Sequence, residues 1–399
     1  MRLTKSLFSR NFVLTILCLN VLLWTVGSLV QRQADLSKAS PGITWFREDN
    51  DFLIYFIGRG WIKPDYLLYQ QGYAEYPPLG VLYVWWPRLL TDNFEVYHWL
   101  LWISNGLFYV LAGWLTWRIA KIWQHGEAAW WLWLLPSVAY YSFNRFDIFP
   151  VVLLLLAVYS YGQNRVRLSG LCYGASIMAK FFPLLLFPLF WQLSKNQKPR
   201  NSVKFILYSL LPPLAFSLAV GLVGGSAAIF SPYILQMERS FEPGTIWFLL
   251  TFVWPQINEL VRSVTSLGQV IIPVVWGFQT LVNKLTATLL VNYHLAALTL
   301  LVFIFFNHFY SNQWWLWVVP WLAWIFPPQL FYWLGFYDIL NYWQYPIAAE
   351  LWGKASVAFN LAVVVRGGVL LVIIAILVKQ LINQKRKNIY ENLAGNPHL

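Results

Sequence analysis

The acidic side chains that could act as a catalytic base are concentrated in one polar stretch of the sequence, from Trp45 to Gly80. The chain contains 16 Asp and Glu residues. Five of them fall in this stretch: Glu48, Asp49, Asp51, Asp65 and Glu75. A general base must be held firmly against its substrate, and Pro77 and Pro78 restrict the backbone where the stretch ends. We therefore expect Asp51 to be the general base, with Asp49 as the second candidate.

The same stretch supplies candidate substrate-binding residues. Tyr55, Arg59, Glu75 and Tyr76 follow Asp51 within one compact polar segment. The alternative for Asp51 is a solvated loop carboxylate, which is what most isolated loop acids are. The density of aromatic and charged neighbours favours the catalytic interpretation.

Charged residues also interrupt apolar sequence in two further motifs. Arg145 and Asp147 in "SFNRFDIFP" lie between two apolar segments, where they form either an interfacial ion pair or a phosphate-binding pair. Lys180 interrupts the apolar run "SIMAKFFPLLL". A lysine inside a membrane segment either faces a partner such as a lipid-linked phosphate or extends to the membrane surface.

The remaining candidates lie in the second half of the chain. Arg239 in "MERSFEPG" is either a phosphate clamp or a loop charge balanced by its neighbours. Gln313 in "YSNQWWLWVVP" can hydrogen-bond a sugar hydroxyl beside stacking tryptophans, or the segment can be an interfacial aromatic belt.

The elements that must position these residues are membrane helices. The chain is 59% hydrophobic and 11% charged, whereas about a quarter of the residues in soluble domains are charged. Apolar runs near the ~20 residues needed to span a bilayer recur from end to end. We expect an all-α, polytopic membrane protein of ten to twelve transmembrane or re-entrant helices.

The positive charge of the chain indicates membrane topology and not nucleic-acid binding. The net charge is +12, but the basic residues form short clusters beside apolar segments, as in cytoplasmic loops. Both termini are basic, so we expect both in the cytoplasm and the protein in the plasma membrane. No single basic stripe suited to DNA or RNA occurs.

The apolar runs divide one integral membrane domain, residues 1–399, into helices and loops. We expect a first extracytoplasmic loop at 31–80, a second outer loop at 224–245 and a basic cytoplasmic tail at 380–399. We expect the segment around Lys180 to bend near Gly174 and Pro183. Predicted helices cover residues 11–30, 96–120, 148–161, 205–223, 287–306, 314–326 and 357–378.

Metal and cofactor sites are not indicated. The two cysteines, Cys18 and Cys172, lie in apolar segments, and the five histidines show no metal-binding spacing. We expect no metal and no cofactor.

Taken in order, these motifs resemble the GT-C superfamily of glycosyltransferases, and most closely glycosyltransferase family 87, the bacterial mannosyltransferase-like branch. The resemblance covers residues 51–320. The motifs that carry it are Asp51, "EYPPL", "RFDIFP", "SGLCYGASIMAKFFPLLLFP", "ERSFEPGTIW" and "SNQWWLWVVP". The chain departs from the family at residues 241–245, where relatives carry a Gln-x-Glu-Ser-like run, which leaves the sugar and the acceptor open.

The resemblance implies an inverting transfer of a hexose, with mannose favoured, from a polyprenyl-phosphate donor to a lipid or glycan acceptor on the extracytoplasmic face. It gives Asp51 the role of base. Because a lipid phosphate leaving group needs cationic neighbours, Arg145, Lys180 and Arg239 are its candidate partners. The main alternative is a transporter or flippase of lipid-linked glycans; the absence of an internal repeat and the gathering of acids in one loop count against it. A catalytically silent membrane scaffold is the third alternative.

Overall fold

All regular structure in the described part of the chain is helical. The computed structural model describes residues 49–57, 76–122, 129–197, 199–269, 289–325 and 328–394. Every element in these residues is an α-, 3-10 or π-helix, which confirms the predicted all-α class. The helix expected at residues 11–30 and much of the expected first loop lie outside the described residues.

The first half of the described chain contains short helices at the candidate site and longer ones behind it. The α-helices are α3 (Asp49–Ile57), α4 (Pro78–Trp85), α5 (Phe94–Ile122), α6 (Pro136–Asn144), α7 (Ile148–Gly162), α8 (Val166–Ala179), α9 (Phe187–Gln197) and α10 (Pro199–Glu238). The 3-10 helices are η1 (Trp86–Leu89), η2 (Trp130–Leu134) and η3 (Phe182–Leu186).

The second half of the described chain also contains both short and long helices. Its elements are α11 (Ile246–Val253), η4 (Pro255–Ile257), α13 (Leu289–Phe306), η5 (Asn312–Trp314), α14 (Trp315–Ile325), η6 (Pro328–Leu330), α15 (Phe331–Tyr342), the π-helical η7 (Trp343–Ala348), α16 (Ala349–Trp352) and α17 (Val357–Ala394). Residues 258–269 are also helical.

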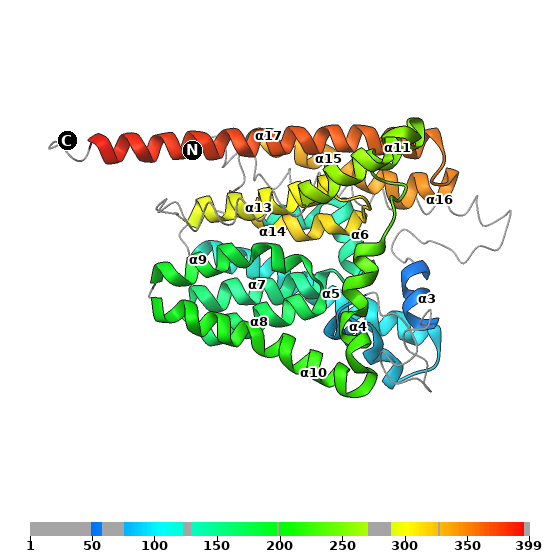
Figure 1. Ribbon diagram of the computed structural model, residues 1–399, viewed down its shortest axis with the longest axis horizontal. Helices are drawn as coiled ribbons and strands as arrows, with labels where there is room; N and C mark the ends of the chain where they lie inside the picture. The colour runs from blue at the N-terminus through cyan, green and yellow to red at the C-terminus, as the bar shows by residue number, and fades with distance from the viewer. Residues whose placement is uncertain are drawn as a thin grey trace.

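Most long helices run along the long axis of the molecule, and the short helices α3, α4, α11 and α16 gather near one end (Figure 1). Within the described residues, three helices are long and apolar enough to cross a membrane, at Phe94–Ile122, Arg200–Ser226 and Val357–Asn383. The bent pair α6 and α7 makes a fourth if it is counted as one span. The chain therefore has the helices of a membrane protein, and the predicted total of ten to twelve segments stays a prediction.

The candidate spans present stripes of apolar side chains on the outside of the bundle. On α5 the exposed large apolar residues are Val96, Trp99, Ile103, Leu107, Val110, Trp114 and Trp117. Their spacing of three and four residues places them on one helix face. An exposed apolar face of this length is suited to lipid and not to water.

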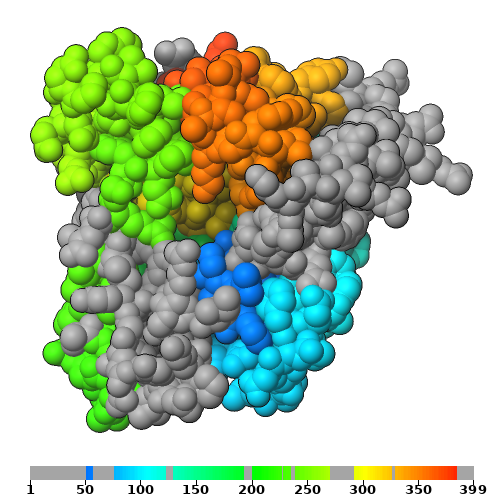
Figure 2. Space-filling model, turned by 90° about the vertical axis from the view of Figure 1, so that its right-hand side faces the viewer, coloured from blue at the N-terminus to red at the C-terminus, as the bar shows by residue number. Residues whose placement is uncertain are grey.

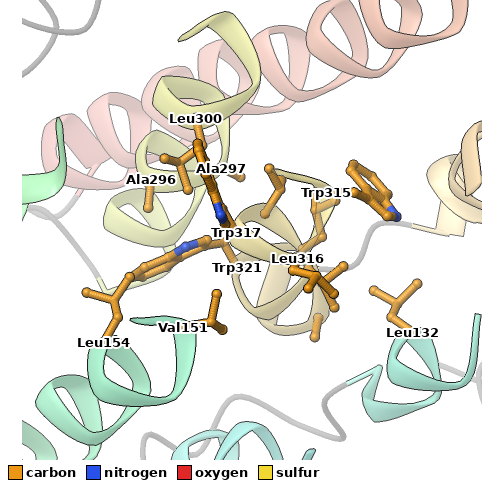
Figure 3. Close-up of a cluster of buried hydrophobic side chains, with 14 of the residues drawn as sticks. Leu132, Val151, Leu154, Ala296, Ala297, Leu300, Trp315, Leu316, Trp317 and Trp321 are labelled. Carbon is orange, nitrogen blue, oxygen red and sulfur yellow. The ribbon is translucent and has the colours of Figure 1, made fainter. Parts of the chain in front are cut away.

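The core lies where α14 packs between α7 and α13. Figure 3 shows Trp317 and Trp321 of α14 among side chains of α7 and α13, with Trp315 on another side of α14. The neighbouring side chains labelled on those two helices are Val151, Leu154, Ala296, Ala297 and Leu300. Because Ala296 and Ala297 are small, the large indoles fit between helices without leaving space.

The chain turns sharply at the "NRFD" motif, as its polar residues between apolar segments predict. α6 ends at Asn144 and α7 starts at Ile148, and the two axes differ by 104°. Arg145 has extended backbone angles, φ −136° and ψ 145°. The motif therefore lies between two helix ends, where its charged side chains can reach different neighbours.

The predicted bend near Lys180 is present, but Gly174 does not cause it. α8 ends at Ala179, Lys180 is extended, and η3 begins two residues later with Pro183 in its first turn. Gly174 lies inside α8, where an added Cβ would lie 2.2 Å from the carbonyl oxygen of Ser209. Its role is close packing of α8 on α10, as in small-xxx-small helix pairs.

Two expected boundaries differ from the structure. Much of the outer loop expected at residues 224–245 is helical, because α10 passes a kink at Gly225 and continues to Glu238. The tail expected from residue 380 continues α17 to Ala394. Beyond Gln329 the chain forms α15 and α16, and Asp338 and Asn341 of α15 are fully buried.

Candidate active site

A cavity of about 480 Å³ brings together residues from five separated segments of the chain. It lies between η3, the helical residues 258–269, the turn at 307–314 and the residues that precede α4. Four sequence-predicted site residues line it: Tyr76, Lys180, Arg239 and Gln313. Leu184, Leu185, Phe182 and Phe303 line its apolar part.

Lys180 reaches the cavity from a buried ion pair. Its Nζ lies 2.7 Å from Oδ1 and 2.8 Å from Oδ2 of Asp147. The Asp147 side chain is 1% exposed and that of Lys180 is 12% exposed. Burial lowers the pKa of Lys180, and the charge of Asp147 opposes this shift. Asp147 is thus the partner of Lys180 inside the protein, and a lipid-linked phosphate partner for Lys180 stays a prediction.

Asp147 is held by a third residue as well. The Trp317 indole Nε1 donates a hydrogen bond of 2.8 Å to Asp147 Oδ1. The Trp317 ring stacks on Phe182, with centroids 4.4 Å apart and planes 6° from parallel. Asp147, which does not itself line the cavity, therefore orients Lys180, and the hydrogen bond from Trp317 holds the Asp147 carboxylate in place.

Arg239 lines the cavity beyond the end of α10. Its guanidinium lies 4.2 Å from the centre of the Phe309 ring, a cation–π contact. Burial lowers the pKa of Arg239, and the neighbouring Glu242 opposes this shift. The cavity is thus lined by two cationic side chains, Lys180 and Arg239.

His308 is a site residue that the sequence reasoning missed. It lines the cavity, and its Nδ1 lies 3.5 Å from Nε2 of Gln269, which is also a lining residue. Burial lowers the pKa of His308, as do the charges of Arg262 and Arg239. Its imidazole is therefore neutral at pH 7 and able to hydrogen-bond a ligand. A single histidine without metal-binding spacing gave no sequence signal.

Gln313 is placed by a buried polar network on α15. Asn341 Nδ2 donates to the Asn312 carbonyl oxygen at 3.0 Å, and Asn312 Nδ2 donates to Asn341 Oδ1 at 2.9 Å. Tyr310 donates to the same Oδ1 at 2.7 Å. These bonds fix the turn from which Ser311 and Gln313 reach the cavity.

The network continues through two further charged residues that were not predicted. Asp338 accepts hydrogen bonds from the backbone N–H and the hydroxyl of Ser137. Arg366 of α17 donates to the Gly244 carbonyl oxygen at 2.7 Å and lies over the Tyr310 ring. Asp338 and Arg366 are each a charged residue within apolar sequence, which is the signal that singled out Lys180, so the same signal could have found them.

Asp51 lies beside the cavity residues without lining the cavity. Its Oδ2 is 3.0 Å from Nε of Arg145, in a pair whose side chains are 27% and 5% exposed. Arg145 also donates from Nη1 to the Asn144 carbonyl oxygen at 3.0 Å. The "NRFD" turn therefore pairs Arg145 with Asp51 and Asp147 with Lys180.

Tyrosines connect Asp51 to the cavity. The Tyr55 hydroxyl donates to Asp51 Oδ2 at 3.4 Å, and the Tyr55 ring lies edge-to-face to that of Tyr76, which lines the cavity, with ring centres 6.5 Å apart. Phe146, fully buried, packs against the rings of both Tyr55 and Tyr76. Figure 2 shows α3 below the α16 region, beside a hollow in the surface.

The other predicted residues are not described at the level of side chains. Asp49 is the first residue of α3, and its side chain lies outside the described part of the structure. Arg59 and Glu75 lie outside the described residues altogether. Within the described ranges no three His, Cys, Asp or Glu side chains are grouped so as to hold a metal ion.

Comparison of the chain with family models, curated proteins and solved structures gives no match. The resemblance to the GT-C superfamily therefore stays a prediction that rests on its own motifs.

Proposed function

We propose that the protein is a membrane glycosyltransferase that moves a hexose from a polyprenyl-phosphate donor to a hydroxyl group of a lipid or glycan. The main support is the cavity, which joins two partly buried cationic side chains, Lys180 and Arg239, to an apolar part formed by η3 and Phe303. A ligand that fits both parts has an anionic group and a hydrocarbon chain. A lipid-linked phosphate sugar has both.

The neutral polar side chains support a sugar in the same cavity. Ser266, Gln269, Asn307, His308, Ser311 and Gln313 all line it. They offer donors and acceptors that suit sugar hydroxyl groups. The indoles of Trp314 and Trp317 also line the cavity and stack on one another. The resemblance adds mannose as the favoured hexose.

In the proposed reaction the acceptor hydroxyl oxygen attacks the anomeric carbon while the bond from that carbon to the phosphate oxygen breaks. Asp51 receives the acceptor proton. Charge develops on the departing lipid phosphate, where Lys180 and Arg239 are placed to stabilise it. Arg145 neutralises Asp51 in the ligand-free protein, at 3.0 Å.

The proposal includes a topology. The protein crosses the plasma membrane several times, both termini are cytoplasmic, and the end with α3 and α16 faces the extracytoplasmic side. The candidate spans support a membrane location, and the basic clusters of the sequence support the orientation.

The test uses the full-length protein in liposomes with radiolabelled polyprenyl-phosphate mannose as donor and a mannose-terminated glycolipid as acceptor. We expect label to enter the acceptor, and we expect Asp51→Asn to lower this rate at least about 100-fold, because general-base catalysis contributes on that order. Label that crosses the bilayer without forming a new glycosidic bond would instead identify a transporter.

A further inference from the structure

Arg366 is a buried arginine inside an apolar helix. It lies on α17 within the candidate span Val357–Asn383 and is 4% exposed. No Asp or Glu of the described residues forms an ion pair with it. A charged side chain in such a position is costly and marks a functional role by default. The partners of Arg366 show what that role is.

Three neutral groups surround the Arg366 guanidinium. Nη2 donates a hydrogen bond of 2.7 Å to the Gly244 carbonyl oxygen, and Nη1 donates one of 3.3 Å to the Tyr337 hydroxyl. The guanidinium carbon lies 3.5 Å from the centre of the Tyr310 ring. α17 packs beside α11 and α15, which brings these groups together (Figure 1). One side chain thus joins three segments that are distant in the sequence.

Two of these partners belong to segments that carry cavity residues. Gly244 and Arg239 lie in the same short segment between α10 and α11, and Tyr310 and Gln313 lie in the turn that follows α13. Arg239 and Gln313 line the cavity, whereas Gly244, Tyr310 and Arg366 do not. Arg366 is therefore bonded to both segments without touching the space that a ligand would fill.

The hydrogen bonds that continue from Arg366 have one direction. Tyr310 donates its hydroxyl proton to Asn341 Oδ1 at 2.7 Å. In the bond of 3.0 Å between Tyr310 and Tyr337, Tyr337 is therefore the donor. The Tyr337 oxygen accepts from Arg366, which has donors only. Asn341 in turn donates to the Asn312 carbonyl oxygen at 3.0 Å. Because each proton in this series has one position, the turn that carries Asn312 is held in one conformation.

The segment that carries Arg239 needs a similar restraint. Gly244 has φ +113°, which glycine adopts readily and other residues do not. A Cβ added there would lie 3.2 Å from Nε2 of Gln344. The side chain of the next residue, Thr245, caps the N-terminus of α11. The backbone therefore turns between Arg239 and α11, and the bond from Arg366 holds the carbonyl oxygen of this turn.

We propose that Arg366 is a positioning residue, which holds the segments of Arg239 and Gln313 at a fixed separation so that Arg239 meets the phosphate of a bound lipid. This inference rests on the proposed function, in which Arg239 is a partner of the donor phosphate. Arginine suits the role because its planar guanidinium donates in two directions and stacks on a ring, whereas the ammonium of lysine is a point charge. Groups that are held in place before binding need not be ordered by the ligand.

The test measures binding of farnesyl phosphate and of farnesol to the full-length protein in detergent. The two probes share one hydrocarbon chain, so the ratio of their affinities reports how well the cationic part of the cavity holds a phosphate. We expect Arg366→Lys to lower this ratio at least about tenfold, because a displaced Arg239 loses a hydrogen bond between charged groups.

Arg118→Lys is the matched control. Arg118 also lies in a candidate span and has cation–π contacts, with Trp114 and Trp117, but it does not line the cavity. We expect this variant to keep the wild-type ratio. If Arg366→Lys does not fold, Tyr337→Phe takes its place, because it removes one acceptor of Arg366 and keeps the bond to Gly244. This variant should lower the ratio in the same direction by a smaller factor.

A double variant shows whether Arg366 acts through Arg239. Arg239→Gln should lower the ratio by itself. Adding Arg366→Lys to it should lower the ratio no further, because residues that act as a unit are not additive. A further fall would mean that Arg366 affects the phosphate by another path, and the positioning role would be wrong.

The remaining outcomes separate this role from general packing and from the proposed function. An unchanged ratio in the folded variant contradicts the positioning role. Equal weakening of both probes also contradicts it, because Arg366 would then maintain only the shape of the cavity. If the ratios behave as expected and the wild-type protein transfers no mannose, the proposed function fails and the positioning role stands. If the wild-type protein binds both probes equally, the phosphate site itself is wrong and both proposals fail.

Discussion

The pair of Asp147 and Lys180 places opposite charges 2.7 Å apart in a nearly solvent-free site. Burying each charge is costly, so removing one partner leaves the other uncompensated. The pair is therefore a stability determinant of the ligand-free protein as well as a component of the site.

We predict that Lys180→Met lowers the free energy of unfolding by about 3–5 kcal/mol, the usual effect of breaking a buried pair. The double variant Asp147→Asn, Lys180→Met should lose clearly less, because no buried charge remains. Thermal unfolding in detergent measures both. A double variant less stable than Lys180→Met would contradict this explanation.

The shifted pKa of His308 makes the stability of the folded protein depend on pH, and the sign of this dependence follows from the direction of the shift. Because burial lowers its pKa in the folded protein, the unfolded chain binds the proton first as pH falls through about 6.5. The contribution of His308 to stability is thus present above that pH and lost below it.

We predict that wild-type protein loses stability relative to His308→Gln as pH falls from about 7 to 5. Above pH 7 the difference between the two proteins should be constant. Unfolding midpoints across this range measure the effect, and the difference removes contributions from the other histidines. A pH-independent difference would show that His308 titrates alike in both states.

At the level of elements, the contact of α8 with α10 sets where Lys180 lies. Lys180 follows directly on the last residue of α8. Cβ atoms added at Gly170 and Gly174 would lie 2.7 Å and 2.2 Å from carbonyl oxygens of α10. Any larger side chain must separate the helices and displace the end of α8.

We predict that Gly174→Ala destabilises the protein by about 1–3 kcal/mol, the typical effect of overpacking, and lowers transfer by moving Lys180. Gly113→Ala is the control, because an added Cβ there meets nothing within 4 Å and α5 is also a candidate span. Thermal unfolding and the transfer assay follow both variants. Equal stability of the two variants would contradict the close-packing role.

The sequence predicts local features of these elements well. The apolar runs predict α5, α7, α13 and α14 nearly as observed, and they predict the start of α17 at Val357 but not its end at Ala394. Pro183 and Lys180 predict the break after α8. Gly174 was misread because glycine marks either a break or a close approach, and the sequence of one helix does not show its neighbour.

The site is only partly predictable because its contacts are distant in sequence. Lys180, Arg239 and Gln313 were predicted from residue type, and the structure brings them to one cavity. Asp338 and Ser137 are 201 positions apart, and nothing in the sequence of either segment predicts a contact with the other. For the same reason the separation of Asp51 from the cavity could not be read from the loop in which it lies.

At the scale of the whole molecule, the helices after Gln329 support the site without lining it. Arg366 joins α17 to Gly244, a few residues beyond Arg239, and it also donates to Tyr337 of α15. Asn341 fixes the turn that carries Gln313. The two walls of the cavity that carry Arg239 and Gln313 are thus tied to helices that the family resemblance does not cover.

The cavity and the outer surface meet at Leu184. This residue lines the apolar part of the cavity and is 53% exposed. A cavity of about 480 Å³ is the size of a drug-binding site, so a long polyprenyl chain must extend out of it. The apolar outer surface around η3 provides a route along which the chain can reach the bilayer.

We predict that wild-type protein binds polyprenyl phosphates more tightly as the chain lengthens, because each buried CH₂ contributes about 0.8 kcal/mol. Leu184→Gln should weaken binding of long chains at least about tenfold while changing binding of a one-isoprene phosphate little. Leu214→Gln is the control: Leu214 is 62% exposed on α10 and does not line the cavity. Competition binding in detergent measures all three proteins. Equal losses in both variants would mean that Leu184 acts through general lipid exposure and that the chain leaves the cavity elsewhere.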